Sequence, residues 1–196
     1  QQTPRALGGN IIKGSQFIRY TVTPQLRYRM IYADTAQKTK ERNDYSVFAC
    51  WGMGVDGRIY LLDLIRGKWE APELLTRARD FWYKHSALNG DHWGNLLMIK
   101  PEDKSSGTGL IQQLRTGDPK LGIAPIPVPP EGQAMKRDKD KLTRVMAAVP
   151  YLDLGQVCIP ELAAWVNDFI EEHEAFTPDD SHAFGDQVDT TCDAIS

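Results

Sequence analysis

Arg29-Met-Ile-Tyr-Ala-Asp34-Thr-Ala is followed by a polar stretch, residues 37–44, and then by Tyr45-Ser-Val-Phe-Ala-Cys50-Trp. The apolar residues before Asp34 predict a short buried strand that ends at this carboxylate. A buried carboxylate needs a cationic or hydrogen-bonding partner, because its transfer out of water is costly. Alone, Asp34 is typical of a strand-end acid paired with a nearby lysine. Two further acidic positions in a similar setting make it a candidate functional residue.

Length and composition favour one globular domain. The chain has 196 residues, of which 41% are hydrophobic and 25% charged, with a net charge of -3. This balance excludes a disordered tail and a strongly basic DNA-coating protein. No apolar run approaches the roughly 20 residues needed to cross a bilayer, so we expect no membrane association. Three scattered cysteines, Cys50, Cys158 and Cys192, indicate reduced thiols in a cytosolic setting rather than a zinc site or disulfide framework.

The beginning of the chain is typical of a linker. Residues 1–24 contain Gly8-Gly9 and two prolines, and predict at most a short edge strand at 16–20. The first residue is Gln rather than Met, so we expect the chain to be part of a longer protein. We therefore divide it into a linker, residues 1–24, and a folded domain, residues 25–196.

Consecutive strands in the first half of the domain, and alternating strands and helices in the second, predict a mixed α/β sheet covered by helices on both faces. Strands are expected at 25–34, 46–53, 58–65, 95–99 and 123–128, with two short strands within 149–159. Helices are expected at 72–85, after Gly109, at 135–148, at 161–174 and from Asp186 onward.

Three acidic points stand beside small or turn-forming residues. Asp34 ends the first predicted strand, Glu102-Asp103 ends the strand at 95–99, and Asp186 begins the last helix. If those two strands are neighbours, their ends bring two acids to one edge of the sheet, and the last helix can add the third. Converging carboxylates need cations, and oxygen ligands favour Mg²⁺ or Mn²⁺. Two such ions clamp the attacking and leaving oxygens of a phosphodiester, which is the chemistry of a metal-dependent nuclease.

These motifs resemble the C-terminal nuclease domain of the large terminase subunit of tailed bacteriophages, which has an RNase H-like fold. The likeness rests on Tyr32-Ala-Asp34-Thr-Ala with Asn43-Asp44-Tyr45-Ser46, on Glu102-Asp103-Lys-Ser-Ser-Gly107-Thr-Gly109-Leu-Ile-Gln, and on Gly185-Asp186-Gln-Val-Asp189. The middle motif is the most specific, and the resemblance extends over essentially the whole chain.

The resemblance implies three metal ligands for catalysis. Asp34 is similar to the ligand that bridges both ions, Asp103 to the second and Asp186 to the third. Glu102 stays open as an alternative to Asp103, because alternation along a strand points only one of two neighbouring acids at the site. Asp189, one helical turn after Asp186, stays open beside Asp186. Asp44 is a possible accessory ligand. The commoner His-Asp-Asp pattern is replaced here by Phe184-Gly185-Asp186, which leaves His182 without an assigned role.

Basic residues near the acids are candidates for phosphate contacts along duplex DNA, which carry no sequence information. The alternative is an ordinary solvated surface. The candidates are Lys38, Lys40, Arg42, Lys104, Lys136, Arg137 and Lys141.

The resemblance implies an Mg²⁺- or Mn²⁺-dependent endonuclease that cuts concatemeric phage DNA in the viral genome-packaging motor, in the cytoplasm of the infected bacterial host. It implies an ATPase domain in the same polypeptide, a small terminase subunit and a portal protein as partners. This chain contains no phosphate-binding loop of the G-x-x-x-x-G-K-[ST] type, so we expect no ATP site in it. We also expect the isolated domain to be monomeric. The alternatives are a non-catalytic DNA- or portal-docking module and another RNase H-like nuclease, such as a resolvase.

Overall fold

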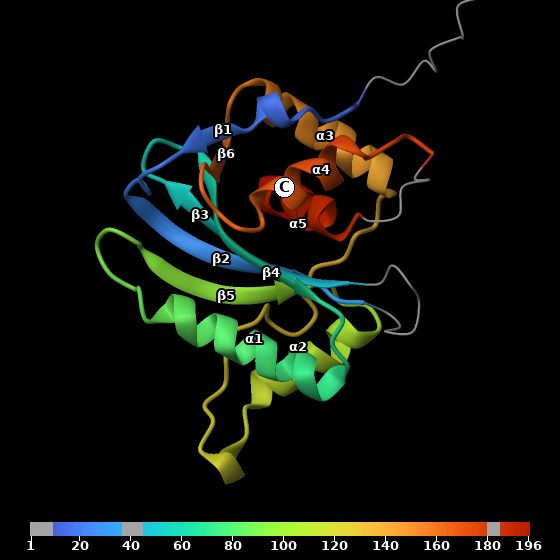
Figure 1. Ribbon diagram of the computed structural model, residues 1–196. Helices are drawn as coiled ribbons and strands as arrows, with labels where there is room; N and C mark the ends of the chain where they lie inside the picture. The colour runs from blue at the N-terminus through green and yellow to red at the C-terminus, as the bar shows by residue number, and fades with distance from the viewer. Residues whose placement is uncertain (1–9, 37–44, 180–184) are drawn as a thin grey trace, which may run out of the picture.

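A mixed β-sheet forms the centre of the molecule in the computed structural model, which describes residues 10–36, 45–179 and 185–196 (Figure 1). Its six strands within these residues follow the order β1-β6-β4-β3-β2-β5. Their bounds are β1 Ile18–Tyr20, β2 Leu26–Asp34, β3 Ser46–Gly54, β4 Ile59–Gly67, β5 Asn95–Pro101 and β6 Val157–Pro160. β3 pairs antiparallel with both β2 and β4, whereas β5 runs parallel to β2 and β6 parallel to β4. β2 and β5 are neighbours, which is the condition on which the sequence placed two acids together, so their carboxyl ends meet at one edge.

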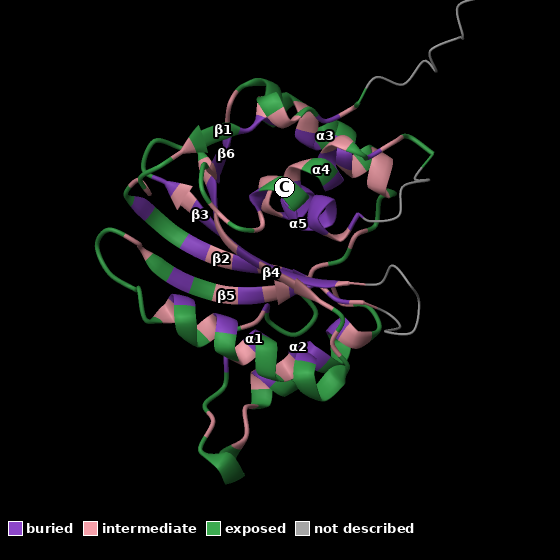
Figure 2. Ribbon diagram, viewed as in Figure 1, coloured by how far each residue is buried: buried purple, intermediate pink, exposed green. Residues whose placement is uncertain are grey.

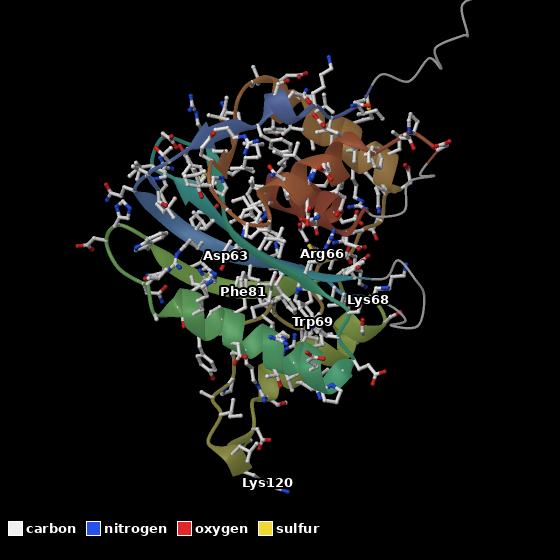
Figure 3. The ribbon with its side chains drawn as sticks, in the orientation of Figure 1. Asp63, Arg66, Lys68, Trp69, Phe81 and Lys120 are labelled. Atoms are coloured by element: carbon white, nitrogen blue, oxygen red, sulfur yellow. The ribbon has the colours of Figure 1, made fainter. Side chains whose placement is uncertain are left out.

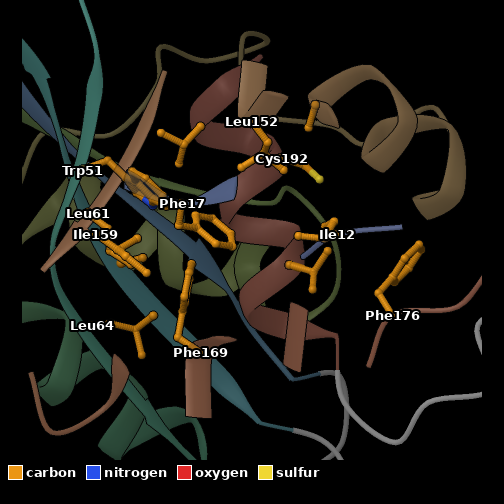
Figure 4. Close-up of a cluster of buried hydrophobic side chains, with 14 of the residues drawn as sticks. Ile12, Phe17, Trp51, Leu61, Leu64, Leu152, Ile159, Phe169, Phe176 and Cys192 are labelled. Carbon is orange, nitrogen blue, oxygen red and sulfur yellow. The ribbon is translucent and has the colours of Figure 1, made fainter. Parts of the chain in front are cut away.

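Helices cover both faces of this sheet, as the sequence predicts (Figure 1). α1 (Ala71–Ser86) and α2 (Ser106–Thr116) lie on one face, and α3 (Lys141–Asp153), α4 (Val166–Glu174) and α5 (Asp186–Ile195) lie on the other. Each face has its own hydrophobic core, the first built around Phe48, Phe81 and Ile99 and the second around Trp51, Phe169 and Val188 (Figure 4). The alternation of side chains along β2 and β3 supplies both cores.

α5 is the most enclosed helix of the fold. It lies against β2 and β3 on one side and against α3 and α4 on the other, and the buried colour extends along it (Figure 2). All residues from Gln187 to Cys192, and Asp193 after them, are buried. The acids of α5 are therefore held in the interior rather than on a solvated surface.

Part of the segment that the sequence assigns to a linker is packed into the domain. Ile12 is 1% exposed and Phe17 is 3% exposed, and both belong to the core beneath α3–α5 (Figure 4). The Phe17 ring meets the rings of Phe169 and His173 edge-on, at centroid distances of 5.4 and 5.3 Å. The predicted edge strand is confirmed as β1. Residues 1–9 of the linker lie outside the described residues.

The strand predicted at 123–128 is wrong. These residues lie in a loop, and Ile123 makes a single bridge to Asp118. Pro125 and Pro127 have no backbone N–H, so this segment cannot form a continuous ladder. It is held instead at separate points, where the N–H of Ile126 donates to Leu114 O and Pro127 O accepts from the N–H of Ile99, both at 2.9 Å.

Three boundaries in the second half of the chain also differ from the prediction. α3 begins at residue 141 rather than 135, because the Asp140 carboxylate caps it by accepting from the N–H of Thr143. The helix then continues through Asp153, so residues 149–153 are helical and only β6 is a strand in the region where two were expected. α4 begins at Val166 rather than at residue 161. The late start of α3 matters for function, since it places Arg137 before the helix.

Of the described residues, no helix is both long and apolar enough to cross a membrane. All three cysteines are buried free thiols.

A fully buried arginine connects β2 to the loop before β5. The Arg29 side chain donates to the carbonyl oxygens of Trp93 (2.8 Å), His85 (2.8 Å) and Gly94 (3.3 Å), and to Asn89 Oδ1 (2.7 Å). These acceptors are neutral, and the Arg29 guanidinium also lies over the Trp93 ring, 6.0 Å from its centroid. Burial lowers the pKa of Arg29.

Replacing Arg29 with Met should lower the free energy of unfolding by about 2–4 kcal/mol, because several buried acceptors lose their donor at once. The matched control is Arg27→Met on the same strand, which removes an exposed side chain that donates to Val55 O at 3.2 Å. It should change stability by less than about 0.5 kcal/mol. Equal losses of unfolding free energy for the two variants in urea denaturation would show that the buried contacts of Arg29 do not stabilise the fold.

His173 should make the domain sensitive to mild acid. It is fully buried between α4 and α5, with Nδ1 donating to Phe169 O (2.6 Å) and Nε2 lying 2.9 Å from Thr191 Oγ1. Burial lowers its pKa to about 4. The unfolded chain binds this proton near pH 6.5, so the stability that neutral His173 supplies is complete above that pH and is lost as pH falls toward 4.

Between pH 6.5 and pH 4 this residue should reduce the free energy of unfolding by about 3 kcal/mol. His173→Gln, which does not titrate, should show a shallower decline in urea denaturation over that range. The control is His92→Gln at an exposed position. A slope equal to that of the wild type in the His173 variant would contradict the assignment.

Candidate active site

β2 delivers Asp34 to the face of the sheet that α5 covers. Tyr32 packs against the core on that face, whereas Ala33 belongs to the opposite core, so alternation directs Asp34 toward α5. The strand end is fixed by Ser46 and Ser106. Ser46 Oγ accepts from the N–H of Ala36 (2.9 Å), and Ser106 Oγ donates to Ala36 O (2.7 Å). The side chain of Asp34 is 13% exposed.

β5 places Glu102, rather than Asp103, beside Asp34. Tyr32 pairs with Lys100 in the parallel register, so Asp34 and Glu102 lie two residues further on the same face. Both carboxylates contact Arg137, whereas Asp103 turns toward α2 and accepts from Thr108 Oγ1 at 2.8 Å. The structure thus brings Glu102 into the cluster and directs Asp103 away from it.

α5 contributes acids at 186, 189 and 193, a spacing that places them along one side of a helix. Asp189 is paired with Lys141 (3.1 Å) and with Arg144, both on α3. Asp186 Oδ2 is buried and has no hydrogen-bond partner among the described residues. An unpaired buried carboxylate oxygen is costly, which makes Asp186 the acid most in need of a cation.

Arg137 lies at the centre of the cluster. Its NH1 is 2.8 Å from Glu102 Oε2 and 3.1 Å from Asp34 Oδ1. Its NH2 and Nε donate to the two carboxylate oxygens of Asp193, at 2.7 and 3.2 Å. The side chain is 7% exposed, so the guanidinium is an interior cation that joins β2, β5 and α5.

The acids in this cluster outweigh the cations locally. Burial raises the pKa of Asp34 well above its ordinary value, and the charges of Asp189 and Asp186 add to the rise although Arg137 opposes it. Burial, with the charge of Glu172, raises the pKa of Asp186 to about 7. Asp189 behaves in the opposite way, because the surrounding cations outweigh burial and lower its pKa. Asp34 and Asp186 are therefore the carboxylates that an added cation would stabilise most.

The donor set suits a hard divalent cation. Every acid in the cluster offers oxygen, which Mg²⁺ and Mn²⁺ prefer, and Asp186 Oδ2, which has no partner within the described part of the chain, suits coordination. In residues 10–36, 45–179 and 185–196, no three potential ligands are already arranged around one point. Arg137 NH1 lies in contact with both Asp34 and Glu102.

The basic residues predicted to contact DNA fall into three groups. Lys104 and Lys136 are exposed on two segments joined by the hydrogen bond from the N–H of Asp103 to Met135 O (2.8 Å). Lys141 pairs with Asp189, and Arg137 is buried among acids instead of on a helix surface. The remaining predicted residues, Lys38, Lys40, Arg42 and Asp44, lie outside the described residues, as does His182.

Sequence reasoning missed three residues of the cluster, namely Asp193, Arg144 and Glu172. Asp193 follows Asp186 and Asp189 at helical spacing, so the face was visible in the sequence. Glu172 gave no such signal, since it comes from α4 and meets α5 only through the fold. Its Oε1 accepts from the N–H of Gln187 (2.7 Å), and its Oε2 pairs with Arg66 of β4 (3.0 Å). Arg66 lies near the end of β4 (Figure 3).

The start of α2 approaches the end of β5 closely at Gly107. A Cβ added to Gly107 would lie 2.0 Å from Glu102 O and 3.3 Å from Thr35 Oγ1. Before it, Ser105 takes a positive φ of 52°, which turns the chain sharply from Asp103 into the helix. The small residues of this motif therefore allow α2 to lie directly against the backbone that carries Glu102.

Comparison with known proteins identifies relatives of this arrangement. The family model described as terminase RNaseH-like domain matches residues 31–196. No curated protein matches the sequence significantly.

Solved structures show the same fold at low sequence identity. The human cytomegalovirus terminase nuclease domain aligns with a TM-score of 0.69 and 12% identity over 93% of both chains. The large terminase nuclease of thermophilic phage G20c with bound magnesium aligns with a TM-score of 0.61 and 14% identity over 97% of both chains. The large terminase of another thermophilic bacteriophage, in complex with ADP, aligns with a TM-score of 0.64 and 13% identity over 94% of this chain. The present chain spans 44% of that protein's length.

The contact at Gly107 predicts opposite effects for two glycines in α2. Gly107→Ala should lower the free energy of unfolding by about 2 kcal/mol or more, because the methyl group would force the helix away from Glu102. Gly109→Ala, where an added Cβ meets nothing within 4 Å, should raise it by about 0.5–1 kcal/mol. Urea denaturation measures both, and a stabilised Gly107 variant would contradict the close approach.

Proposed function

The chain belongs to the terminase RNaseH-like domain family, and from that membership we propose that it is a metal-dependent DNA endonuclease of a viral genome-packaging motor. The observation that carries the proposal is that Asp34 and Glu102, at the ends of β2 and β5, share Arg137, while Asp186 and Asp189 of α5 act on Asp34 through their charges. Such a group of acids supports phosphodiester hydrolysis once divalent metal is bound, because the metal supplies the positive charge that the acids lack.

Asp34, Glu102 and Asp186 are the proposed metal ligands. Asp34 has the central place, since it feels the charges of both Asp186 and Asp189 and shares Arg137 with Glu102. Glu102 takes the second position in preference to Asp103, because it lies on the same face as Asp34. Divalent Mg²⁺ or Mn²⁺, two ions during catalysis, would activate a water molecule and stabilise the leaving oxygen. Related nuclease domains have been solved with magnesium, manganese or zinc.

The surrounding residues position the ligands. Asp189 ties α5 to α3 through Lys141 and Arg144, and Glu172 accepts from the first turn of α5 while it pairs with Arg66. These contacts attach α5, the helix that begins with Asp186, to α3, α4 and β4.

Double-stranded DNA is the proposed substrate, in concatemeric form. Lys104 and Lys136, which are exposed, are proposed to contact phosphates, and Lys38, Lys40 and Arg42 are proposed to extend that contact. We also propose an ATPase domain in the same polypeptide, a small terminase subunit and a portal protein as partners, and the cytoplasm of the bacterial host as the place of action. The isolated domain is proposed to be monomeric.

The chain should nick supercoiled plasmid DNA in the presence of Mn²⁺ and lose this activity when EDTA is added. Asp34→Asn, Glu102→Gln and Asp186→Asn should each reduce the rate about 100-fold or more, beyond the 10- to 100-fold typical of residues that only support ligands. Asp103→Asn should keep much of the activity. The control is Asp80→Asn, an exposed acid on α1.

The outcomes separate the alternatives. A domain that folds and binds DNA but never cuts it would be a docking module, and the hydrolytic assignment would be withdrawn. Loss of activity in Asp103→Asn with retention in Glu102→Gln would reverse the choice between those two acids. Circular dichroism of each variant distinguishes lost chemistry from lost fold.

A further inference from the structure

Arg137 contacts acids from three different elements of the fold. Its NH1 is in contact with Asp34 Oδ1 and with Glu102 Oε2, the two oxygens from neighbouring strands that a shared metal ion would need. Its Nε and NH2 make a side-on pair with Asp193 on α5. The guanidinium therefore connects the same three elements that carry the proposed ligands.

The position of Arg137 is set by the backbone and not by the side chain alone. Met135 forms a parallel bridge with Glu102, and Met135 O accepts from the N–H of Asp103 at 2.8 Å. Asp140 then caps α3, which fixes the chain on the other side of the arginine. The segment is thus attached beside the end of β5, so that Arg137 reaches the acids from a fixed origin.

A guanidinium nitrogen and a divalent cation cannot occupy this place together. Mg²⁺ requires oxygens at about 2.0–2.1 Å, closer than the distances of 2.8 and 3.1 Å to NH1. Two cations bound to the same pair of oxygens would also repel each other. Arg137 would have to leave Asp34 and Glu102 before a metal ion could bridge them.

We propose that Arg137 is a built-in competitor of the divalent metal, which holds Asp34 and Glu102 together in the metal-free domain and has to leave both acids when metal binds. Asp193 is the anchor of this arginine rather than a metal ligand, since both of its carboxylate oxygens are engaged by the guanidinium. The inference rests on the proposed function, because it concerns metal binding by the same acids. The proposed competition predicts that the acid cluster stays ordered without metal. It also predicts that the domain binds metal more weakly than it would without Arg137.

The test is calorimetric titration of Mn²⁺ into the metal-free chain without DNA. Arg137→Gln should bind Mn²⁺ about tenfold or more tightly than the wild type, because a site that is open only about a tenth of the time loses that factor in apparent affinity. Asp193→Asn keeps Arg137 but weakens its anchor, and should lie between the two. The matched control is Arg77→Gln, which removes an exposed pair with Glu73 on α1 and should bind as the wild type does.

Each result has a distinct meaning. Wild-type binding of Mn²⁺ with equal or weaker binding by Arg137→Gln would overturn the competition and leave the proposed nuclease function standing. Failure of the wild type and of both variants to bind Mn²⁺ would overturn the metal-dependent function and the competition with it. If Arg137→Gln does not fold, Asp193→Asn decides the matter, and affinity equal to the wild type in that variant would refute the proposal.

Discussion

The parallel pairing of β2 with β5 is the constraint on which the rest of the structure depends. Its register sets Tyr32 beside Lys100, and alternation then places Asp34 and Glu102 on one face at one edge of the sheet. A shift of one residue in either strand would turn one of these acids into the opposite core, among apolar side chains. The buried rows of Ile31, Ala33 and Ile99 oppose such a shift, so the same residues that form a core also fix the site.

α5 completes the arrangement by bringing a row of acids into the interior. A helix whose inner side carries Asp186, Asp189 and Asp193 is unfavourable unless cations meet it, and Lys141, Arg144 and Arg137 do so from the segments around α3. Asp186 keeps one carboxylate oxygen without a hydrogen-bond partner among the described residues, and Asp34 shares Arg137 with Glu102. The fold thus concentrates its unbalanced charge at the point where the two strands and the helix converge.

Much of this arrangement was accessible from the sequence. The apolar runs before Asp34 and Glu102 and the turn residues between strands predicted β2 to β5 and the covering helices, whereas the adjacency of β2 and β5 entered only as a condition. The prediction failed where local pattern and tertiary contact disagree, as with the prolines that remove a strand at 123–128 and the Asp140 cap that delays α3. The roles of Arg137 and Glu172 could not be foreseen, since a buried arginine among acids has the same sequence signature as a surface arginine beside DNA.

The packing of Ile12 and Phe17 into the core determines how far the chain can be shortened at its beginning. The Phe17 ring rests on Phe169 and His173 of α4, and His173 in turn meets Thr191 in the middle of α5. A clone trimmed to start at the first long strand would lose an edge of the sheet and the support of α4, and the disturbance would reach α5. Ile12 and Phe17 therefore belong to the folded unit, and the contacts of Phe17 reach the helix that carries the acids by way of α4.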